Sequence, residues 1–306
     1  MKYYVGLDIG GTKCAVILGN SKLEIVEKIK FDTRAGRPAE EILSELRVGL
    51  DRILQNRKLS PKDIISIGIS CGGPLDSKHG IILSPPNLPG WDKIRITDYF
   101  NQVYNVPVFL ENDANACALA EWKLGAGQGT ENMIFLTFGT GMGAGLILDS
   151  RLYRGKSDMA GEVGHMRLLE DGPRGYGKNG SFEGFCSGGG MRELSEKYFG
   201  EKITVKEAAK RANNGDKRAL ELFREAGKYL GRGLAVLTDI LNPEMIVIGS
   251  IYARCELLLK ESMEEELAKE SLEINRTDCK VVPAKLGESI GDFGALMTAL
   301  YKINPE

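Results

Sequence analysis

The stretch from Asp8 to Lys13 combines residue types that suit a bound phosphate and its metal ion. Two glycines at its centre allow the backbone to approach a ligand closely, and successive N–H groups there can point at an anion. Asp8 adds a carboxylate, Thr12 a hydroxyl and Lys13 an ammonium group. An ordinary tight hairpin is the competing interpretation, because Gly-Gly is also typical of short turns between strands.

A second glycine turn repeats this arrangement later in the chain. Residues 3–7 and 14–18 flank the first turn with apolar runs that predict two strands. The Gly/Thr turn at 139–143 lies between the apolar runs 133–138 and 144–148 in the same way. Two similar halves, each presenting a phosphate-binding hairpin to a cleft between them, would explain the repetition. The second turn contains G-x-G-x-x-A, but a dinucleotide-binding fingerprint requires a helix after its glycines, and a strand follows here.

Length and composition restrict the class of protein. The 306 residues suffice for two domains, 27% of them are charged, and the formal net charge is −2. The chain lacks the basic excess typical of nucleic-acid binding, an apolar run of ~20 residues and a signal-peptide pattern. Six scattered cysteines without a C-x-x-C pair favour buried thiols in a reducing cytosol. We therefore expect a cytoplasmic protein that binds neither nucleic acid nor membrane.

Two predicted strands end in polar segments. Residues 64–69 predict a buried strand that runs into a loop containing Gly73, and residues 106–110 predict another that runs into Asp113. Ligands collect at the carboxyl ends of strands in open α/β sheets. Asp113 could serve there as a general base, or it could simply cap the helix that is predicted to begin at Ala114.

Two further segments could contact a substrate. The proline-rich stretch 84–91 cannot be regular structure. It is either a loop held by the Trp91 ring or a substrate-side loop that presents the Asn87 amide. Glu162 and His165 lie three residues apart, and they form either a solvated turn or a polar clamp on a hydroxyl-rich ligand.

The rest of the chain alternates predicted strands and helices. Apolar spacing predicts helices over Pro38–Leu59, Thr204–Asn213, Lys217–Leu241, Ala253–Leu267 and Ile290–Ile303, and strands over Leu23–Ile29, Glu244–Ile248 and Lys280–Leu286. Residues 172–190 contain eight glycines. Because ordering so many glycines is costly in entropy, this segment must be either mobile or held by other contacts.

Together these segments resemble the ROK family of bacterial sugar kinases and sugar-responsive repressors, which belongs to the actin-like class that includes hexokinases. The resemblance rests on Leu7–Lys13, Pro86–Leu88, Glu111–Ala116, Thr137–Gly141, Ala160–His165 and Ile246–Gly249. It runs from Tyr3 to the last predicted helix. It implies an α/β fold of two actin-like (ribonuclease H-like) lobes around a central cleft. The expected N-terminal lobe comprises residues 1–117 and 290–306, and the expected C-terminal lobe comprises residues 118–289.

The resemblance also implies functions for individual residues. The phosphates of ATP would be bound by Asp8, Gly10, Gly11, Thr12, Lys13, Thr137, Gly139, Thr140 and Gly141, and the adenosine would be bordered by Gly249 and Ser250. The sugar would be bound by Gly73, Asn87, Asn112, Asp113, Glu162, His165 and Glu183. Asp113 would also take the proton from the attacking hydroxyl, and Asp8 would hold Mg²⁺ through water. Ser250 stands where the family usually has a second glycine.

The activity that the resemblance implies is ATP-dependent phosphorylation of a hexose, as in a glucokinase, by in-line phosphoryl transfer. The protein would act as a homodimer. One alternative is a catalytically inactive sugar-binding sensor or regulator, and another is a kinase for an N-acetylhexosamine, allose, fructose or a β-glucoside. Repressors of the family carry a helix-turn-helix domain before the first hairpin. Because that hairpin begins at Tyr3 here, we expect the kinase branch without a DNA-binding domain.

The metal-binding pattern of the family is altered in this chain. Zinc-binding members carry C-x-C-G-x-x-G-C-x-E after the histidine, and the three cysteine positions here are Arg174, Tyr176 and Ser181. A guanidinium cannot bind a cation, and a phenol and an alcohol are poor zinc ligands at neutral pH. Because a structural zinc site needs four ligands, we expect no structural zinc.

We predict that the purified protein contains well under one zinc per chain by elemental analysis. Treatment with a chelator should leave the melting temperature and the sugar-dependent activity unchanged, because the loop offers no set of thiolates to hold the metal. Stoichiometric zinc, with activity lost on chelation, would show that the loop has recruited other ligands.

Overall fold

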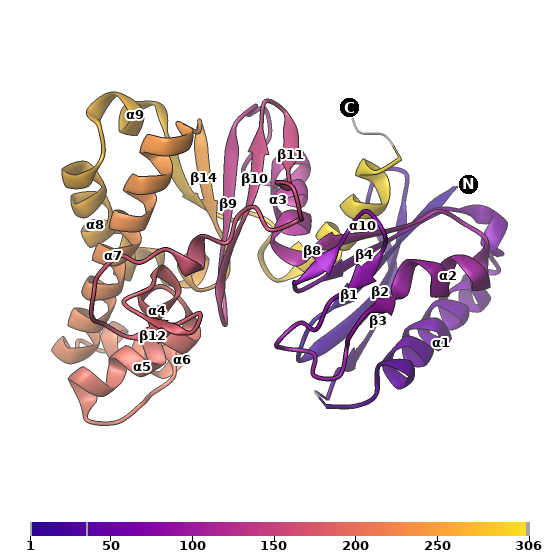
Figure 1. Cartoon of the computed structure of the whole chain (residues 1–306), viewed down its shortest axis with the longest axis horizontal. Coiled ribbons are helices and arrows are strands. Elements are labelled where there is room, and N and C mark those ends of the chain that lie inside the picture. The colour runs from indigo at the N-terminus through magenta and orange to yellow at the C-terminus, as the bar shows by residue number, and fades with distance from the viewer. Residues whose placement is uncertain (1, 35, 304–306) are drawn as a thin grey trace. The chain divides into compact units, whose positions relative to one another are not determined.

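The computed structural model describes residues 2–34 and 36–303, which divide into two α/β units (Figure 1). Unit 1 contains the described residues of the ranges 1–120, 154–160 and 288–306. Unit 2 contains Glu121–Tyr153 and Gly161–Gly287. Each unit is built around its own five-stranded sheet.

The segment Arg154–Ala160 corrects the expected lobe boundaries. It was expected in the C-terminal lobe, but it belongs to unit 1. The Arg154 guanidinium pairs with the buried Glu111 carboxylate at 2.7 Å. The Asp158 carboxylate accepts hydrogen bonds from the Ser77 N–H at 2.7 Å and from its hydroxyl at 2.9 Å. These polar contacts attach the segment to unit 1.

The sheet of unit 1 has the strand order β3-β2-β1-β4-β8. Its strands are β1 (Tyr3–Ile9), β2 (Lys13–Asn20), β3 (Ile25–Asp32), β4 (Ile64–Cys71) and β8 (Val108–Asn112). Strands β1, β2 and β3 form an antiparallel meander, whereas β4 runs parallel to β1, and β8 runs parallel to β4. The parallel pairing brings the carboxyl ends of β1, β4 and β8 to one edge of the sheet.

The sheet of unit 2 repeats this topology. Its order is β11-β10-β9-β14-β15. The strands are β9 (Met133–Phe138), β10 (Met142–Leu148), β11 (Arg151–Tyr153), β14 (Met245–Ile248) and β15 (Lys280–Pro283). The first three are antiparallel and the last two run parallel to β9, as β4 and β8 do to β1. The prediction of two similar α/β halves is therefore confirmed.

Helices cover these sheets. They are α1 (Ala39–Arg57), α2 (Ile96–Tyr104), α3 (Asp113–Leu124), α4 (Phe182–Phe185), α5 (Gly188–Phe199), α6 (Val205–Asn213), α7 (Lys217–Leu241), α8 (Ile251–Glu270), α9 (Glu273–Asp278) and α10 (Ile290–Tyr301). Short strands add β5 (Leu75–Asp76), β6 (Ile81–Ile82), β7 (Ile94–Arg95), β12 (Arg174–Gly175) and β13 (Lys178–Asn179). Among the residues that the structure describes, no helix is long and apolar enough to span a bilayer.

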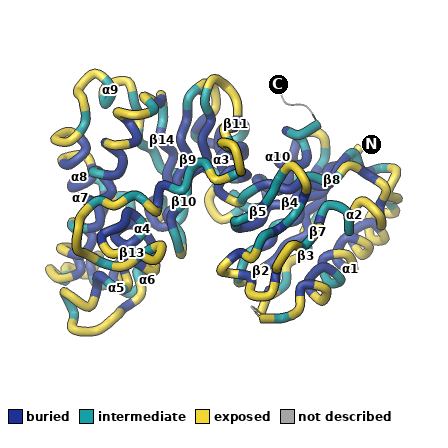
Figure 2. The backbone as a smooth tube through the Cα atoms, viewed as in Figure 1, coloured by how far each residue is buried: buried dark blue, intermediate teal, exposed yellow. Residues whose placement is uncertain are grey.

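The core of unit 1 lies between its sheet and helices α1 and α2. Alternate residues of β1, including Val5, Leu7 and Ile9, join Leu46 and Leu50 of α1 in one buried apolar cluster. Figure 2 shows the central strands as mostly buried, whereas α1 exposes its outer face. Burial of the apolar stripe of α1 explains why its spacing predicted a helix.

Helix α10 packs on the other face of this sheet at unusually short range. A β-carbon at Gly68 would lie 2.3 Å from both the Ala295 oxygen and the Ala299 nitrogen. A β-carbon at Gly6 would lie 2.9 Å from that of Ala295. The absence of side chains at these positions in β1 and β4 lets the helix backbone touch the strands.

We predict that Gly68→Ala lowers the free energy of unfolding by about 3 kcal/mol, because the new methyl group meets backbone atoms that have little room to move. Urea-induced unfolding followed by circular dichroism would measure the loss. Gly49→Ala in α1 is the matched control, since its β-carbon would lie 3.1 Å from a Val16 methyl group. Replacing glycine by alanine inside a helix gains up to about 1 kcal/mol of helix propensity. The free energy of unfolding of this control should therefore stay within about 1 kcal/mol of the native value. Native stability in Gly68→Ala would contradict the close packing of α10.

Candidate functional site

The first glycine turn lies between β1 and β2 and is held by a neighbouring strand end. The Gly10 N–H donates to the Lys13 oxygen at 3.0 Å. The Thr33 hydroxyl donates to the Gly10 oxygen at 2.6 Å, and the Thr33 N–H donates to the Thr12 oxygen at 2.9 Å. The turn backbone is therefore fixed before any ligand binds, as an anion site built from N–H groups requires.

The Asn87 side chain lies against this turn. A β-carbon at Gly11 would lie 2.9 Å from both the Asn87 β-carbon and its backbone oxygen. On the other side, a β-carbon at Gly72 would lie 3.2 Å from Asn87 Nδ2. The ring of Trp91 is buried, and the backbone N–H of Trp91 donates to the Leu88 oxygen at 3.2 Å, which holds the loop. Trp91 therefore anchors the loop, and Asn87 lies beside the first glycine turn. The contact of Asn87 with a substrate stays a prediction.

The end of β8 brings Asn112 and Asp113 to the same edge of the sheet. Asn112 precedes the first residue of α3, and its Oδ1 accepts a hydrogen bond from the Ala114 N–H at 2.9 Å. Asp113 Oδ1 accepts from the same N–H at 2.8 Å. Asn112 thus occupies the N-cap position, so capping alone does not explain an aspartate at position 113. A β-carbon at Gly73 would lie 3.2 Å from Asn112 Nδ2, which places Gly73 beside this amide.

A carboxylate that sequence reasoning missed completes this group. Burial, followed by the negative charges of Asp292 and Asp113, raises the pKa of Asp8 to about 7. Asp292 is itself buried and pairs with the Lys28 ammonium. A β-carbon at Gly291 would lie 2.7 Å from Asp8 Oδ2, so the space beside the carboxylate depends on glycine. A charged residue inside the apolar stretch of the last helix was the available signal for Asp292.

Because these carboxylates repel one another, a divalent cation would stabilise their ionised forms. Carboxylate oxygens are also the ligands that Mg²⁺ prefers. The chemistry of the Asp8 carboxylate is therefore compatible with the expected contact to Mg²⁺ through water, which stays a prediction.

The second glycine turn lies between β9 and β10 and borders a pocket of about 450 Å³ within unit 2. The pocket is lined by Gly139, Thr140, Gly188, Gly189, Arg192, Thr204, Val205, Ser250, Ile251 and Arg254. The N–H groups of Gly188 and Gly189, at the start of α5, donate to the Gly139 and Thr140 oxygens at 2.7 and 3.2 Å. Predicted residues Gly139, Thr140 and Ser250 therefore share one pocket. The rest of the lining was missed, in part because α5 begins with three glycines that disfavour a helix.

Three predicted residues lie around this pocket without lining it. Gly249 precedes Ser250, and its N–H donates to the Leu136 oxygen at 2.9 Å. A β-carbon at Gly139 would lie 3.4 Å from the Thr137 hydroxyl oxygen. The Gly141 oxygen accepts from the Gly139 N–H at 3.0 Å, which closes the turn. Ser250 has a φ of 59°, a region that favours glycine.

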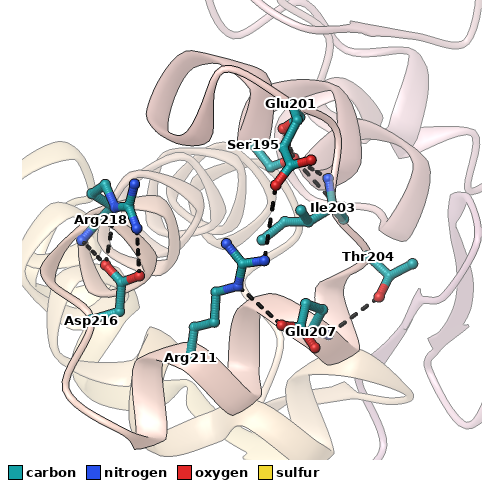
Figure 3. A network of polar contacts seen from close by, with 8 residues as sticks. All are labelled: Ser195, Glu201, Ile203, Thr204, Glu207, Arg211, Asp216 and Arg218. Atoms are coloured by element: carbon teal, nitrogen blue, oxygen red, sulfur yellow. Dashed lines mark hydrogen bonds and ion pairs between the residues drawn. The ribbon is translucent and has the colours of Figure 1, made fainter.

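A polar network holds the far wall of this pocket (Figure 3). The Ser195 hydroxyl oxygen accepts from the Ile203 N–H at 2.9 Å, and the Thr204 hydroxyl caps α6 by accepting from the Glu207 N–H at 3.2 Å. Arg211 pairs with Glu207 at 3.0 Å and with Glu201 at 3.9 Å. These contacts fix the connection between α5 and α6, and with it Thr204 at the pocket wall.

The predicted sugar-contacting residues of unit 2 are gathered by Tyr176. Its hydroxyl donates to Glu162 Oε2 at 2.5 Å, and its ring lies edge-on to His165 with centroids 5.1 Å apart. Its N–H donates to Glu183 Oε1 at 2.8 Å, while Glu183 Oε2 accepts from the Met142 N–H at 2.9 Å. Glu183 therefore connects the glycine-rich segment to β10, and its contact with a sugar stays a prediction.

The glycine-rich segment is held by hydrogen bonds and aromatic packing. The Ser181 hydroxyl donates to the Gly175 oxygen at 2.8 Å and accepts from the Gly184 N–H at 3.1 Å. Phe182 and Phe185 are buried, and Phe185 stacks on Tyr229 with centroids 3.6 Å apart. Within residues 2–34 and 36–303, no group of three or more His, Cys, Asp and Glu side chains could hold a metal ion. The absence of zinc remains a prediction.

Comparisons with known proteins agree with this description. A glucokinase from Halalkalibacterium halodurans is 29% identical over 96% of this chain and 93% of its own length. A xylose repressor from Caldicellulosiruptor bescii is 28% identical over 95% of this chain and 76% of its own length. The crystal structure of a ROK family glucokinase from Streptomyces griseus, in complex with glucose and AMPPNP, is 28% identical and covers 97% of this chain and 99% of its own, with a TM-score of 0.81. Because residues 4–302 match the model of the ROK family, the chain belongs to that family.

Proposed function

We propose that this chain is an ATP-dependent kinase that phosphorylates a hydroxyl of glucose or a closely related hexose. The observation that carries the proposal lies within unit 1. Asn87 contacts Gly11 of the phosphate turn. Asn112 is the last residue of β8 and Asp113 follows it, and β8 is the neighbour of β4, which ends beside Gly72. Groups suited to a phosphate, to sugar hydroxyls and to proton removal therefore share one edge of a single sheet.

Each unit offers its own groups to ATP. The turn after β1 offers backbone N–H groups and the Lys13 ammonium to the phosphates, and the turn after β9 borders a pocket that suits a nucleoside. Mg²⁺ bound with ATP would neutralise phosphate charge during transfer. Asp8 would hold the ion through water, and its environment of other carboxylates supports that assignment.

The proton of the acceptor hydroxyl would pass to Asp113. As the sugar oxygen bonds to the γ-phosphorus and the bond to ADP breaks, the hydroxyl proton moves to a carboxylate oxygen of Asp113. Asn87, Asn112, Glu162 and His165 would bind the remaining sugar hydroxyls. These contacts would orient one hydroxyl for attack, which is where most of the rate gain in this chemistry arises.

A sugar sensor without catalysis is the second candidate. The observation that favours it is the similarity to a xylose repressor over nearly the whole chain. The retention of Asp113 and both phosphate turns supports the kinase instead, because a protein that only binds sugar has no use for a general base.

We predict sugar-dependent ADP release when the protein is mixed with Mg-ATP and a panel of sugars. The panel contains glucose, fructose, mannose, allose, N-acetylglucosamine, N-acetylmannosamine and a β-glucoside, with no sugar as the control. Glucose or a near relative should give the highest kcat/KM. Turnover on none of them, together with xylose-dependent binding to duplex DNA, would replace the kinase with the repressor function.

We predict that Asp113→Asn lowers kcat by 10²–10⁴-fold, since general-base catalysis typically contributes roughly that factor. The melting temperature should stay close to the native value, because Asn substitutes well for Asp at a helix start. Asp98→Asn is the matched control, because Asp98 also lies in the first turn of a helix but is exposed on α2. The control should retain full activity. Full activity with an early melting transition in Asp113→Asn would assign the residue a structural role.

A further inference from the structure

Tyr176 occupies an unfavourable backbone conformation at the tip of the hairpin that joins β12 and β13. Its φ is 52°, and that of Gly177 is 78°. Two-residue turns with both φ angles positive favour Asn, Asp or Gly at the first position, whereas a bulky residue there is an outlier. Such a conformation persists only where surrounding contacts determine it, and it often marks a functional position. The side chain of Tyr176 therefore needs an explanation beyond the turn.

The contacts of Tyr176 converge on three residues that the family resemblance assigns to the sugar. The hydroxyl donates to Glu162 at 2.5 Å, the backbone N–H donates to Glu183 at 2.8 Å, and the ring lies edge-on to His165 at 65°. Glu162 is the N-cap residue of a short 3₁₀ turn, Val163–His165, and His165 is the last residue of that turn and is exposed. Without Tyr176, the side chains of Glu162 and His165 could each adopt several rotamers.

The protonation state of the Tyr176 hydroxyl allows it to act as a hydrogen-bond donor at all times. Burial raises the pKa of the phenol, and the hydrogen bond to Glu162 raises it further. The hydroxyl therefore stays protonated at neutral pH and donates to the Glu162 carboxylate. This bond engages Oε2 of Glu162, and its Oε1 would accept a hydroxyl of the ligand.

We propose that Tyr176 is a positioning residue that fixes Glu162 and His165 in one arrangement for binding a hexose. The proposal deepens the proposed function and rests on it for the identity of the ligand. Tyr176 acts through its two neighbours and need not touch the sugar. Pre-fixing the two side chains lowers the entropy lost when the sugar binds.

Two variants separate the hydroxyl from the rest of the residue. Tyr176→Phe keeps the ring against His165 and removes only the bond to Glu162. Tyr176→Asn removes the ring as well, but it supplies the residue that the turn prefers before Gly177. If Tyr176 positions Glu162 and His165, both variants keep the native melting temperature. The KM for sugar should rise about tenfold in Tyr176→Phe and further in Tyr176→Asn. The KM for ATP should stay unchanged in both.

The two histidines of the chain allow a direct readout by NMR. His79 pairs with Asp76 in unit 1 and serves as the internal reference. In the native protein, titration with glucose should shift the ring signals of His165 but not those of His79. Tyr176→Phe should weaken this response about tenfold in apparent Kd. Tyr176→Asn should also move the starting position of the His165 signals, because the ring current of Tyr176 is lost.

The outcomes distinguish this inference from the proposed function. A His165 response to glucose without kinase turnover would end the kinase proposal but would support the role of Tyr176 if the variants weaken that response. Native-like Kd values in both variants would overturn the inference, as would a melting temperature that falls in proportion to the loss of binding. A His165 that does not respond to glucose in the native protein would also overturn it.

Discussion

The contact between α10 and the sheet of unit 1 is the constraint on which the candidate site residues of unit 1 depend. The helix backbone touches β1 and β4 because Gly6 and Gly68 present no side chains. This distance fixes where the first turn of α10 lies, and that turn carries Gly291 and Asp292 to Asp8. Close packing of backbone on backbone therefore creates a group of carboxylates at the end of β1, and their repulsion favours a bound cation.

The candidate site residues of unit 2 depend on a different kind of contact. Its glycine-rich segment has little stiffness of its own, so its position comes from the buried Phe182 and Phe185 and from the Glu183 carboxylate. Glu183 joins the segment to β10 beside the second glycine turn. Tyr176 in turn contacts Glu162 through its hydroxyl and His165 through its ring. A polar and aromatic scaffold thus provides the rigidity that a metal ion could otherwise supply.

Local patterns were sufficient to predict the repeated hairpins, the strand that ends just before Asp113 and the irregular loop that contains Asn87. Each of these features lies within a few residues of sequence, where turn composition and strand periodicity are informative. Asp292, by contrast, pairs with Lys28 from the opposite end of the chain. The charge of Asp292 stands out in its helix, but no local pattern identifies Lys28 as its partner. The return of Arg154–Ala160 to unit 1 depends equally on distant partners.

Tyr176 is a second residue whose role could not be predicted from the local sequence. Sequence reasoning treated Tyr176 as the replacement of a zinc ligand and did not assign it a partner, because a tyrosine among glycines belongs to no helical or strand period. Its importance came from three contacts that only the folded chain brings together. Residues that organise a site through their neighbours are therefore harder to find from sequence than those with reactive groups of their own.

The central claim is that Asp113 accepts a proton from a sugar hydroxyl that attacks ATP. A crystal structure of the Asp113→Asn variant, grown with Mg-ATP and the most active sugar, tests it most directly. The account predicts intact ATP, with one sugar hydroxyl within hydrogen-bond distance of the amide at position 113 and facing the γ-phosphate. A sugar hydroxyl directed at another side chain, or complete conversion to ADP and sugar phosphate at the native rate, would contradict the account.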